Sequence, residues 1–514
     1  MAIRVLRSPA DFETAAPALV RALDDQPGMF FRSGTETPGR YARWDLGLVA
    51  PAVILRSKDR ALWLEAQDED GLRLLSLFEP ALQAEPTVAT VVRDGNALRA
   101  RLHPMATHFA EEERSRQPSL FTALRALLGA LAPAGSPFHR PGGAGEGADG
   151  YLGFFGAFGY DLAFQFEPIT PRHDRPPGLT PDDCVLYLPL AVLVVDRRRE
   201  TATWHRYVID TPAGPAGPAA LPGPSDPPPA PSASSSTADP TSDQTPEQFM
   251  SKVRRVQEGC ARGDYFEVVL SQQFSVPCAL SGSLLFDRLS ARNPSPYLFY
   301  FNLGRERLIG SSPEMFLRVE DARTIETCPI AGTVRRGADA VEDAAQRARL
   351  YGSLKDESEL TMCTDVDRND LCRVCEPGSV RLLGRRLLET YSKLIHTVDH
   401  VAGTLRADCD ALDGFVSHMW ACTVTGAPKK IALQTIEDLE ESPRGYYAGA
   451  IGFVSALGTL NSGITLRTLH LADGVARVRA GATLLYDSDP AAEEAETRLK
   501  AAALLDALQR GDHQ

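Results

Sequence analysis

Short strand-like runs recur along most of the sequence, and they do not alternate regularly with helix-like runs. They lie at residues 52–55, 90–92, 185–188, 191–195, 266–270, 297–302, 315–319, 449–455, 462–471 and 475–485. Leucines at helical spacing indicate a helix over residues 119–131, Thr245-Pro246 is a typical helix start, and residues 491–508 favour a helix. Strands mixed with helices in this irregular order predict an α+β fold with large antiparallel sheets.

One stretch has the composition of a linker. Residues 211–244 are rich in Pro, Ala, Ser and Gly and nearly lack large apolar residues. Such a segment buries too little surface to offset its ordering entropy, so we expect a disordered linker or insertion there. The chain is therefore divided into an N-terminal part at 1–210, the linker at 211–244 and a C-terminal part at 245–514.

Charge and composition exclude several classes of partner. The net charge of the 514 residues is −13, which argues against nucleic acid and against an anionic membrane surface. The sequence has no apolar run of the ~18 residues that a membrane helix needs. Nine cysteines scattered through a chain of this size favour reduced thiols, so we expect a cytoplasmic protein with no membrane and no nucleic-acid partner.

Two acidic pairs are candidates for a metal site. Glu493 and Glu496 are spaced i, i+3 in the C-terminal helical run, and Asp356 and Glu359 have the same spacing. Residues at this spacing share one helix face, and two such faces could hold Mg²⁺, which prefers oxygen ligands. Taken alone, each pair could equally be a solvated helix face.

Other residues could bind a ligand beside these acids, and some of them also have a purely structural interpretation. Arg467 interrupts an apolar run that we interpret as one strand, where it could hold an anion or form a structural salt bridge. His396 lies in an apolar strand-like run, as a core histidine often does. Residues 329–337 read as a loop with two glycines and Thr333, able to contact a small ligand. Residues 479–485 read as a strand that opens with small residues, whose amides could approach an anion.

Six motifs together resemble the chorismate-utilising enzymes, and most closely anthranilate synthase component I. They are PIAGTVRRG (329–337), ESELTMCTDVDRNDLCRV (357–374), LIHTVDHVAGTL (394–405), TVTGAPKKIALQTIEDLE (423–440), YYAGAIGF (446–453) and RAGATLLYDSDPAAEEAETRLK (479–500). ETPGRYARWDL (36–46) and GAFGYDLAFQFE (156–167) are similar to the form in which the synthase is fused to an amidotransferase in some bacteria. The resemblance implies two large antiparallel sheets flanked by helices, with both sequence halves interleaved.

The resemblance also implies a set of site residues. Glu359 and Glu496 match the family's Mg²⁺ ligands, and Asp356 and Glu493 take supporting positions, although the family has Glu where Asp356 stands. The matches to positions that hold the two carboxylates of chorismate are Gly332, Thr333, Tyr447, Arg467, Gly481, Ala482, Thr483 and Lys500. The expected catalytic residues are Glu314, His396, Glu267 and Thr423.

The reaction that this resemblance implies is amination of chorismate by ammonia, with elimination of pyruvate to give anthranilate. Glu314 resembles the general acid that assists loss of the ring hydroxyl, a role that needs a raised pKa. His396 is assigned to proton transfer in the elimination. Relatives that add water have Lys where this chain has Glu267, so ammonia is the favoured nucleophile.

The implied ammonia source is a partner. A class I glutaminase needs Cys in a G-x-C-x-G turn, and none of the nine cysteines has those flanks. We therefore expect a separate glutamine amidotransferase subunit or domain, in a hetero-oligomer or a homodimer. The alternatives are a synthase that stops at 2-amino-2-deoxyisochorismate, an aminodeoxychorismate synthase, and a catalytically silent binding subunit.

Control by tryptophan is predicted to be weak or absent, as would suit secondary metabolism. The family binds L-tryptophan near a Leu-Leu-Glu-Ser motif and an Asn-Pro-Ser-Pro-Tyr-Met segment. This chain keeps the second nearly intact, including Pro296, Tyr297 and Leu298, but of the first it keeps only Ser33. Arg32 stands in place of the Glu and could remove the contact to the ammonium group of the effector.

Overall fold

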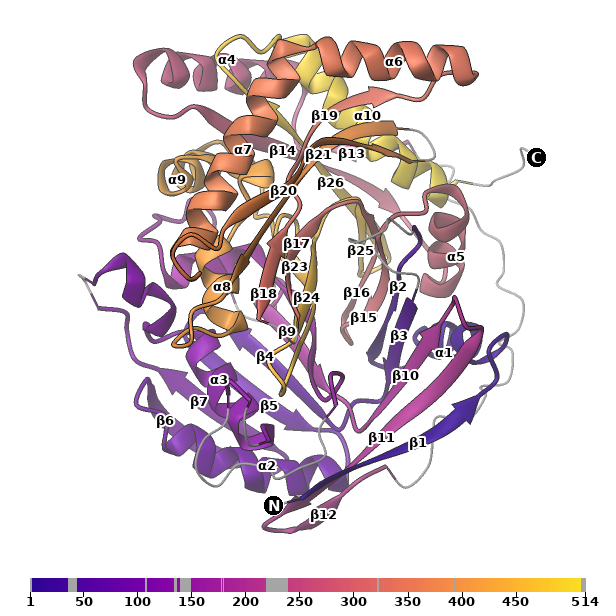
Figure 1. Ribbon diagram of the computed structural model, residues 1–514, viewed down its shortest axis with the longest axis vertical. Coiled ribbons are helices and arrows are strands. Elements are labelled where there is room, and N and C mark those ends of the chain that lie inside the picture. Colours follow the sequence, from indigo (N-terminus) through magenta and orange to yellow (C-terminus); the bar gives the residue numbers. More distant parts are fainter. Residues whose placement is uncertain are drawn as a thin grey trace.

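Two antiparallel sheets of thirteen strands each form the body of the protein in the computed structural model (Figure 1). The structure describes residues 2–35, 44–106, 109–133, 136–138, 149–176, 178, 180–218, 239–320, 323–391 and 394–509. All strand pairs among these residues are antiparallel, and helices flank the sheets, so the predicted α+β fold is confirmed.

The first sheet takes strands from both halves of the sequence. Its order is β1 (Ile3–Ala10), β11 (Thr201–Thr211), β10 (Ala191–Asp196), β3 (Trp44–Val49), β2 (Gly28–Arg32), β15 (Tyr297–Asn302), β16 (Glu306–Ser312), β25 (Thr468–Ala472), β26 (Val475–Leu484), β14 (Glu267–Pro277) and β13 (Thr241–Ser242), with β12 (Gly214–Ala216) on β11 and β22 (Gly426–Ala427) on β14. The N-terminal β2 therefore pairs directly with the C-terminal β15.

The second sheet is interleaved in the same way. Its order is β19 (Ile330–Arg335), β21 (Leu394–Thr404), β18 (Thr324–Thr327), β17 (Met315–Val319), β24 (Leu460–Ile464), β23 (Ala450–Ser455), β8 (Gly153–Phe158), β9 (Cys184–Leu188), β4 (Val53–Lys58), β5 (Ala61–Ala66), β7 (Ala97–Leu102) and β6 (Val88–Asp94), with β20 (Arg381–Thr390) on β21. The halves on either side of the proline-rich stretch thus fold as one unit.

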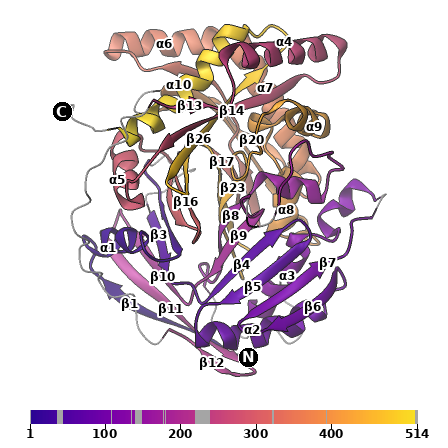
Figure 2. The same ribbon diagram turned by 180° about the vertical axis from the view of Figure 1, so that it is seen from behind.

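Several of the helices begin at a residue whose side chain caps them. The helices are α1 (Ala15–Ala22), α2 (Glu69–Gln83), α3 (Leu120–Leu131), α4 (Pro246–Arg262), α5 (Gly282–Arg292), α6 (Ala340–Gly352), α7 (Leu354–Cys372), α8 (Ala411–His418), α9 (Lys429–Leu439) and α10 (Pro490–Leu508). Thr245 and Gln248 form a capping box before α4, and the Asp489 side chain accepts from an amide in the first turn of α10. Figure 2 shows α4 and α10 together at one end of the molecule.

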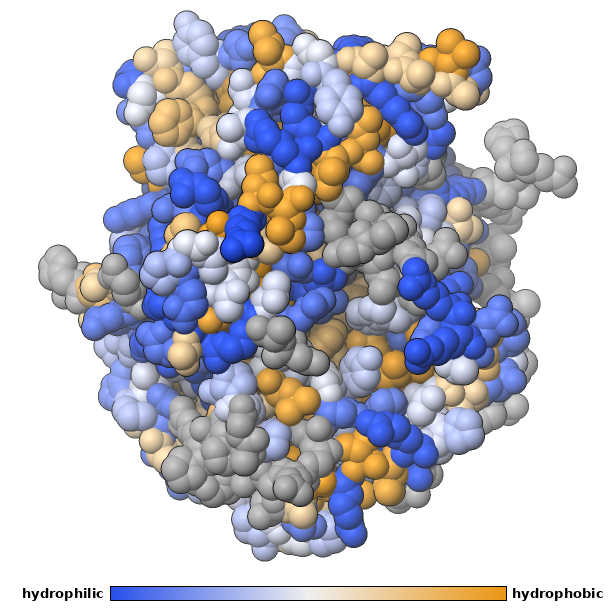
Figure 3. Space-filling model, viewed as in Figure 1, coloured by the Kyte–Doolittle hydropathy of each residue, from blue (hydrophilic) through white to orange (hydrophobic). Residues whose placement is uncertain are grey.

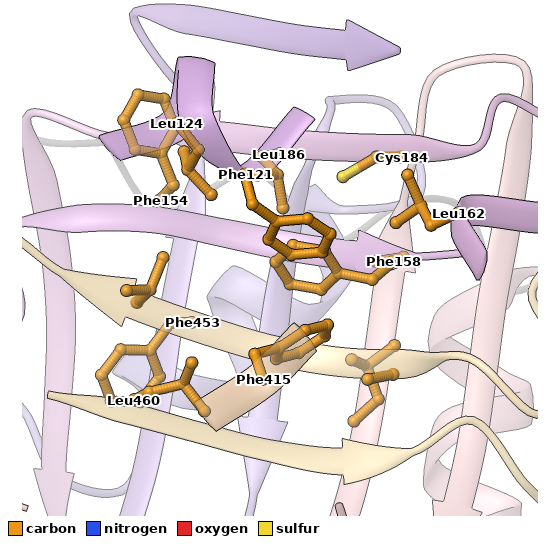
Figure 4. Packing of buried hydrophobic residues seen from close by; sticks show 14 of the residues in the cluster. Phe121, Leu124, Phe154, Phe158, Leu162, Cys184, Leu186, Phe415, Phe453 and Leu460 are labelled. Atoms are coloured by element: carbon orange, nitrogen blue, oxygen red, sulfur yellow. The ribbon is translucent and has the colours of Figure 1, made fainter. Parts of the chain in front are cut away.

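The main core joins residues of both sheets with residues of α2, α3 and α8. Aromatic rings from distant parts of the chain meet there, including Phe121, Phe158 and Phe415 (Figure 4). The Phe158 and Phe415 centroids are 4.8 Å apart, and those of Phe121 and Phe415 are 5.3 Å apart. Because α3, β8 and α8 each contribute one ring, this contact holds the N-terminal and C-terminal halves together.

Several connections cross from one sheet to the other, and two of them lie side by side. The chain passes from β16 to β17 through Pro313-Glu314, and from β24 to β25 through Thr465, Leu466 and Arg467. The crossings are adjacent, because the Ile464 amide donates to the Glu314 carbonyl at 3.0 Å and the Ser311 amide donates to the Arg467 carbonyl at 3.1 Å. The prediction of one strand over 462–471 was therefore wrong: Arg467 has a φ of 49° and lies in the turn between two sheets.

The ends of the proline-rich stretch contain short strands. β11 ends at Thr211, and β12 and β13 both lie within 211–244, whereas residues 219–238 lie outside the described residues. Of the motif at 36–46, the structure describes residues 44–46. No described helix is long and apolar enough to span a bilayer. The face in Figure 3 mixes hydrophilic and hydrophobic residues. Some apolar side chains of the protein are exposed, such as Leu383 at 57%.

Candidate active site

One cavity gathers most of the predicted site residues, where the two sheets meet beneath α7 and α10. The predicted residues that line it are Glu314, Gly332, Thr333, Asp356, Glu359, His396, Thr423, Tyr447, Arg467, Gly481, Thr483, Glu493, Glu496 and Lys500. They come from segments up to about 190 residues apart, brought together by the packing of α7 on β19 and β21 and of α10 on β26.

Carboxylates from two helices occupy one wall. Asp356 and Glu359 project from α7, and Glu493 and Glu496 project from α10. Burial raises the pKa of Glu359 to about 8, and the neighbouring acids Glu267, Glu496 and Asp356 raise it further while Lys500 opposes them. A carboxylate crowded by other carboxylates in this way is a place where a cation lowers the electrostatic free energy.

The donor set of this wall fits Mg²⁺. All four side chains offer hard oxygen atoms that carry negative charge when ionised, and two helices present them to one cavity. Lysines offset part of that charge: Lys500 Nζ is 2.6 Å from Glu496, and Lys355 Nζ is 3.6 Å from Glu493. No three of these oxygens converge within 4.8 Å among the described residues.

Cations and a phenol face the acidic wall. Arg467 forms no ion pair with a described residue, and burial lowers the pKa of its guanidinium although Tyr447 and Glu496 oppose that shift. A desolvated guanidinium of this kind is suited to a bidentate carboxylate ligand. The Lys500 ammonium also donates to the Gly481 carbonyl at 3.0 Å. A Cβ at Gly481 would lie 2.7 Å from the Tyr447 hydroxyl oxygen, so glycine makes room for that ring.

The segment read as a loop at 329–337 is a strand with an irregularity, so that prediction was wrong. β19 pairs with β21, and the register shifts between Ala331 and Thr333. Gly332 occupies the shift with a φ of +77°, and a Cβ there would lie 3.0 Å from the Cβ of Asp356. The bulge explains why the sequence looked like a loop, because it needs glycine at a left-handed position and turns backbone groups into the cavity.

His396 is a neutral hydrogen-bonding group in this cavity. Its Nδ1 lies 2.9 Å from the Thr333 hydroxyl oxygen, and its side chain is buried. Burial lowers the pKa of His396 to about 3, with further lowering by the charges of Arg467 and Lys500. A dianionic ligand between these groups would offset both cations and raise this pKa, which would make the imidazole a better proton acceptor.

Glu314 is a buried carboxyl group at the floor of the cavity. The Glu314 side chain is buried, with the residue 4% exposed. Its Oε1 accepts one hydrogen bond from the Thr423 hydroxyl at 2.8 Å and another from the Ile330 amide at 3.3 Å. Burial raises its pKa to about 8, although the two hydrogen bonds lower it. The side chain is therefore mostly protonated at neutral pH, which is the state that a general acid requires.

Two predicted residues do not line the cavity. Ala482 is fully buried on β26 and packs in the main core, so only its backbone is near the site. Glu267, the first residue of β14, is also fully buried and lies behind the wall, where the Cys422 Sγ is 2.8 Å from its Oε1. Burial raises the pKa of Glu267 to about 7.

The segments predicted to bind tryptophan lie together, away from the cavity lining. β2 pairs with β15 so that Leu298 lies opposite Arg32, and the Gly34 amide donates to the Ser295 carbonyl at 2.8 Å. Ser33 follows β2, and Pro296 and Tyr297 lead into β15. The structure thus brings the two motifs side by side, and an effector there stays a prediction.

Several lining residues were missed from the sequence. Lys355 and Arg479 both line the cavity. The Arg479 guanidinium donates hydrogen bonds to the Glu440 carboxylate at 3.3 Å and to the Ser271 hydroxyl at 3.1 Å. Lys355 directly precedes the acidic pair on α7, so its position next to Asp356 was the available signal. The convergence of Cys363, Cys422 and Glu267 had no signal in the sequence, because these residues are 96 and 155 positions apart.

An α+β fold with a cavity of opposed carboxylates and cations defines the class of protein, and comparison with known proteins identifies it. A model of the chorismate binding enzymes matches residues 88–506, and the chain belongs to that family. The prediction of a chorismate-utilising enzyme of the anthranilate synthase component I type is thereby confirmed at the level of the family.

Curated relatives and solved structures agree. The chain is 48% identical over 499 residues to "anthranilate synthase" of Azospirillum brasilense, covering 97% of this chain but 65% of that relative. It is 34% identical to the pyocyanine-specific anthranilate synthase component 1 of Pseudomonas aeruginosa, over 92% of this chain and 88% of the relative. Anthranilate synthase component I from Streptococcus pneumoniae has the same fold, with a TM-score of 0.63 at 23% identity, covering 92% of this chain and 93% of that structure.

Proposed function

We propose that the chain aminates chorismate with ammonia and eliminates pyruvate, which gives anthranilate. The observation that carries this proposal is the arrangement around one cavity of the buried Glu314 carboxyl group, four carboxyl groups from α7 and α10, and Arg467, which forms no ion pair with a described residue. The 48% identity to a protein named anthranilate synthase supports it, although the chain spans only 65% of that relative.

Substrate binding follows from the charges of the cavity. Chorismate is a dianion, and Arg467 and Lys500 would each take one of its carboxylates or share one, with the Tyr447 hydroxyl as a further donor. Glu359 and Glu496, supported by Asp356 and Glu493, would hold Mg²⁺, which supplies charge neutralisation and orients a substrate carboxylate. The acidic wall then attracts the substrate instead of repelling it.

Amination needs an acid for the leaving hydroxyl. The nitrogen lone pair forms a bond to the ring carbon beside the carboxylate-bearing carbon, the two conjugated ring double bonds each shift by one position, and the carbon–oxygen bond to the hydroxyl breaks. Glu314 donates its proton so that the oxygen departs as water, which is the part of the reaction that a carboxyl group with a pKa of about 8 can perform at neutral pH. The ammonium formed on the substrate then loses a proton to solvent or to the Glu314 carboxylate.

Elimination completes the aromatic ring. The carbon–hydrogen bond at the aminated carbon breaks, its electron pair forms the last ring double bond, and the enolpyruvyl oxygen departs as pyruvate after protonation. Neutral His396, held by Thr333, is the base that we assign to this proton. Without this second step the product would be 2-amino-2-deoxyisochorismate, which keeps the pyruvyl group.

The test is a reaction of the purified chain with chorismate, ammonium and Mg²⁺, followed by mass and by fluorescence. Fluorescent anthranilate together with pyruvate is expected. A non-fluorescent amino adduct that retains the pyruvyl group would show the alternative synthase, and no consumption of chorismate would contradict the proposed function. Glutamine in place of ammonium should give no product, because we assign ammonia supply to a glutamine amidotransferase partner, and glutaminase activity of the chain alone would contradict that assignment.

A further inference from the structure

Behind the acidic wall of the cavity, three potential metal ligands meet in a second, separate cluster. Glu267 begins β14, Cys363 lies in the middle of α7, and Cys422 begins a short 3₁₀ turn at Cys422–Val424. Their ligand atoms all lie within 4.8 Å of one another. The Cys422 Sγ is 2.8 Å and the Cys363 Sγ is 3.8 Å from the same oxygen, Oε1 of Glu267.

The cluster is buried, and its carboxyl group, that of Glu267, is hydrogen-bonded through only one of its two oxygens among the described residues. The exposed fractions of Glu267, Cys363 and Cys422 are 0%, 1% and 0%. Oε2 of Glu267 is buried without a hydrogen-bond partner among the described residues. A buried carboxylate with an oxygen that lacks a partner is costly, so a proton or a cation must offset its charge.

The donor set selects a class of cation. Two thiols and one carboxylate suit a thiophilic divalent ion such as Zn²⁺ or Cd²⁺, whereas Mg²⁺ prefers the all-oxygen wall of Asp356, Glu359, Glu493 and Glu496. Tetrahedral Zn²⁺ with bonds of about 2.0–2.3 Å places neighbouring ligand atoms about 3–4 Å apart. The contacts of 2.8 and 3.8 Å reach this spacing with small side-chain movements.

We propose that Glu267, Cys363 and Cys422 form a binding site for one thiophilic divalent cation, separate from the Mg²⁺ wall. Binding releases the two thiol protons, forms two metal–sulfur bonds and one metal–oxygen bond, and leaves a fourth position open. The site adjoins the active cavity, because Cys363 lies one helical turn after Glu359 and Cys422 precedes Thr423. A bound ion would therefore inhibit turnover; that consequence rests on the proposed function, whereas binding itself does not.

The test is a Cd²⁺ titration of the reduced, metal-free chain in excess Mg²⁺, which saturates the oxygen ligands. The ultraviolet sulfur-to-cadmium charge-transfer band should rise to one equivalent. Cys363→Ser and Cys422→Ser should each weaken binding at least about 100-fold, and Glu267→Gln should weaken it about 10-fold while the band remains. The double variant Cys372→Ser/Cys375→Ser is the matched control, because this C-x-x-C pair could itself bind Cd²⁺, and the variant should bind like the wild type.

Three results would overturn the site. The first is that Cd²⁺ does not bind stoichiometrically. The second is that Cys363→Ser and Cys422→Ser both bind Cd²⁺ like the wild type. The third is that the charge-transfer band is lost only in the control variant. X-ray absorption of the Zn²⁺-loaded wild-type chain covers the case in which a variant does not fold. Two sulfur neighbours with lighter atoms are expected, and a shell of oxygen and nitrogen alone would refute the assignment.

Discussion

The hydroxyl of Thr423 donates a hydrogen bond of 2.8 Å to Oε1 of Glu314. Burial raises the pKa of Glu314 to about 8, and this hydrogen bond acts in the opposite direction because it stabilises the carboxylate. Thr423 thus sets how acidic the buried carboxyl group is. A general acid works only while it is protonated, so the pKa of Glu314 limits the pH range of the reaction. The Thr423 hydroxyl therefore influences that pH range through its hydrogen bond to Glu314.

The first prediction concerns this pH range. The rate per unit of free ammonia should fall as the pH rises through about 8, where Glu314 loses its proton. Thr423→Val removes the bond that stabilises the carboxylate, so the pKa rises and the alkaline limb should move to higher pH. Glu314→Gln should lower kcat by about 100- to 10,000-fold and abolish that limb.

A matched control for the valine variant is Thr435→Val on α9, whose hydroxyl donates to the Ile431 carbonyl of its own helix. Its pH profile should equal that of the wild type. A limb that stays in place, or moves to lower pH, in Thr423→Val would show that Thr423 does not tune Glu314.

The second prediction concerns the metal ligands. Glu359→Gln and Glu496→Gln should each lower the affinity for Mn²⁺, used as a paramagnetic substitute for Mg²⁺, by more than about 10-fold. Chelation should abolish chorismate consumption, and added Mg²⁺ should restore it. Glu357→Gln is the control on the same helix, because Glu357 faces Arg385 and Arg386 at 3.7 and 3.0 Å. Equal Mn²⁺ binding by all three variants would remove these carboxylates from the metal site.

Local sequence patterns predicted some elements closely and failed where the chain changes sheets. The strands at 297–302 and 315–319 have the predicted bounds, because a fully buried strand appears as an apolar run between polar residues. Arg467 was placed in mid-strand, since nothing in the flanking residues distinguishes a crossing between sheets from a continuous strand. Gly332 suggested a loop, because a bulge and a turn both need glycine at positive φ.

The site itself could be located from the resemblance but not from the pattern alone. An acidic pair on one helix face is equally a solvated surface until a second helix is known to face it, and α7 and α10 are separated by more than 100 residues. The same limit explains the missed cluster of Glu267, Cys363 and Cys422. Sequence spacing carries no information about such contacts, which the interleaved sheets create.

The third prediction concerns space at Gly481. A Cβ there would lie 2.7 Å from the Tyr447 hydroxyl oxygen, so Gly481→Ala must displace the Tyr447 side chain. Displacing a substrate-binding group by about 1 Å can cost about 100-fold in kcat/KM, with little effect on folding. Gly352→Ala is the control, because no atom lies within 4 Å of a Cβ at Gly352. Wild-type kcat/KM in Gly481→Ala would exclude Tyr447 from substrate binding.

The fourth prediction concerns the network beneath the cavity. Arg444 is buried and donates to the Glu440 carboxylate at 2.7 and 3.0 Å and to the carbonyls of Val424 and Val269 at 2.7 Å. Arg444→Met leaves Glu440 paired with Arg479 alone, so the free energy of unfolding in urea should fall by about 3–5 kcal/mol. Arg99→Met, at an exposed position of β7, should change it by less than about 0.5 kcal/mol. Equal stability of the two variants would contradict a structural role for the network.

The fifth prediction concerns tryptophan. Arg32 stands where the family has an acid that meets the effector's ammonium group, and its Nε donates to Asp45 at 3.3 Å while its guanidinium lies 5.3 Å from the Phe30 ring centroid. A fixed positive charge at this position should repel that ammonium group, so tryptophan at low-micromolar concentration should leave the rate unchanged. The measurement is an inhibition curve at constant chorismate and ammonium, with direct binding followed by calorimetry. Inhibition at low-micromolar concentration would show that Arg32 does not block the effector, and Ser33→Ala would then test whether the binding uses the predicted segment.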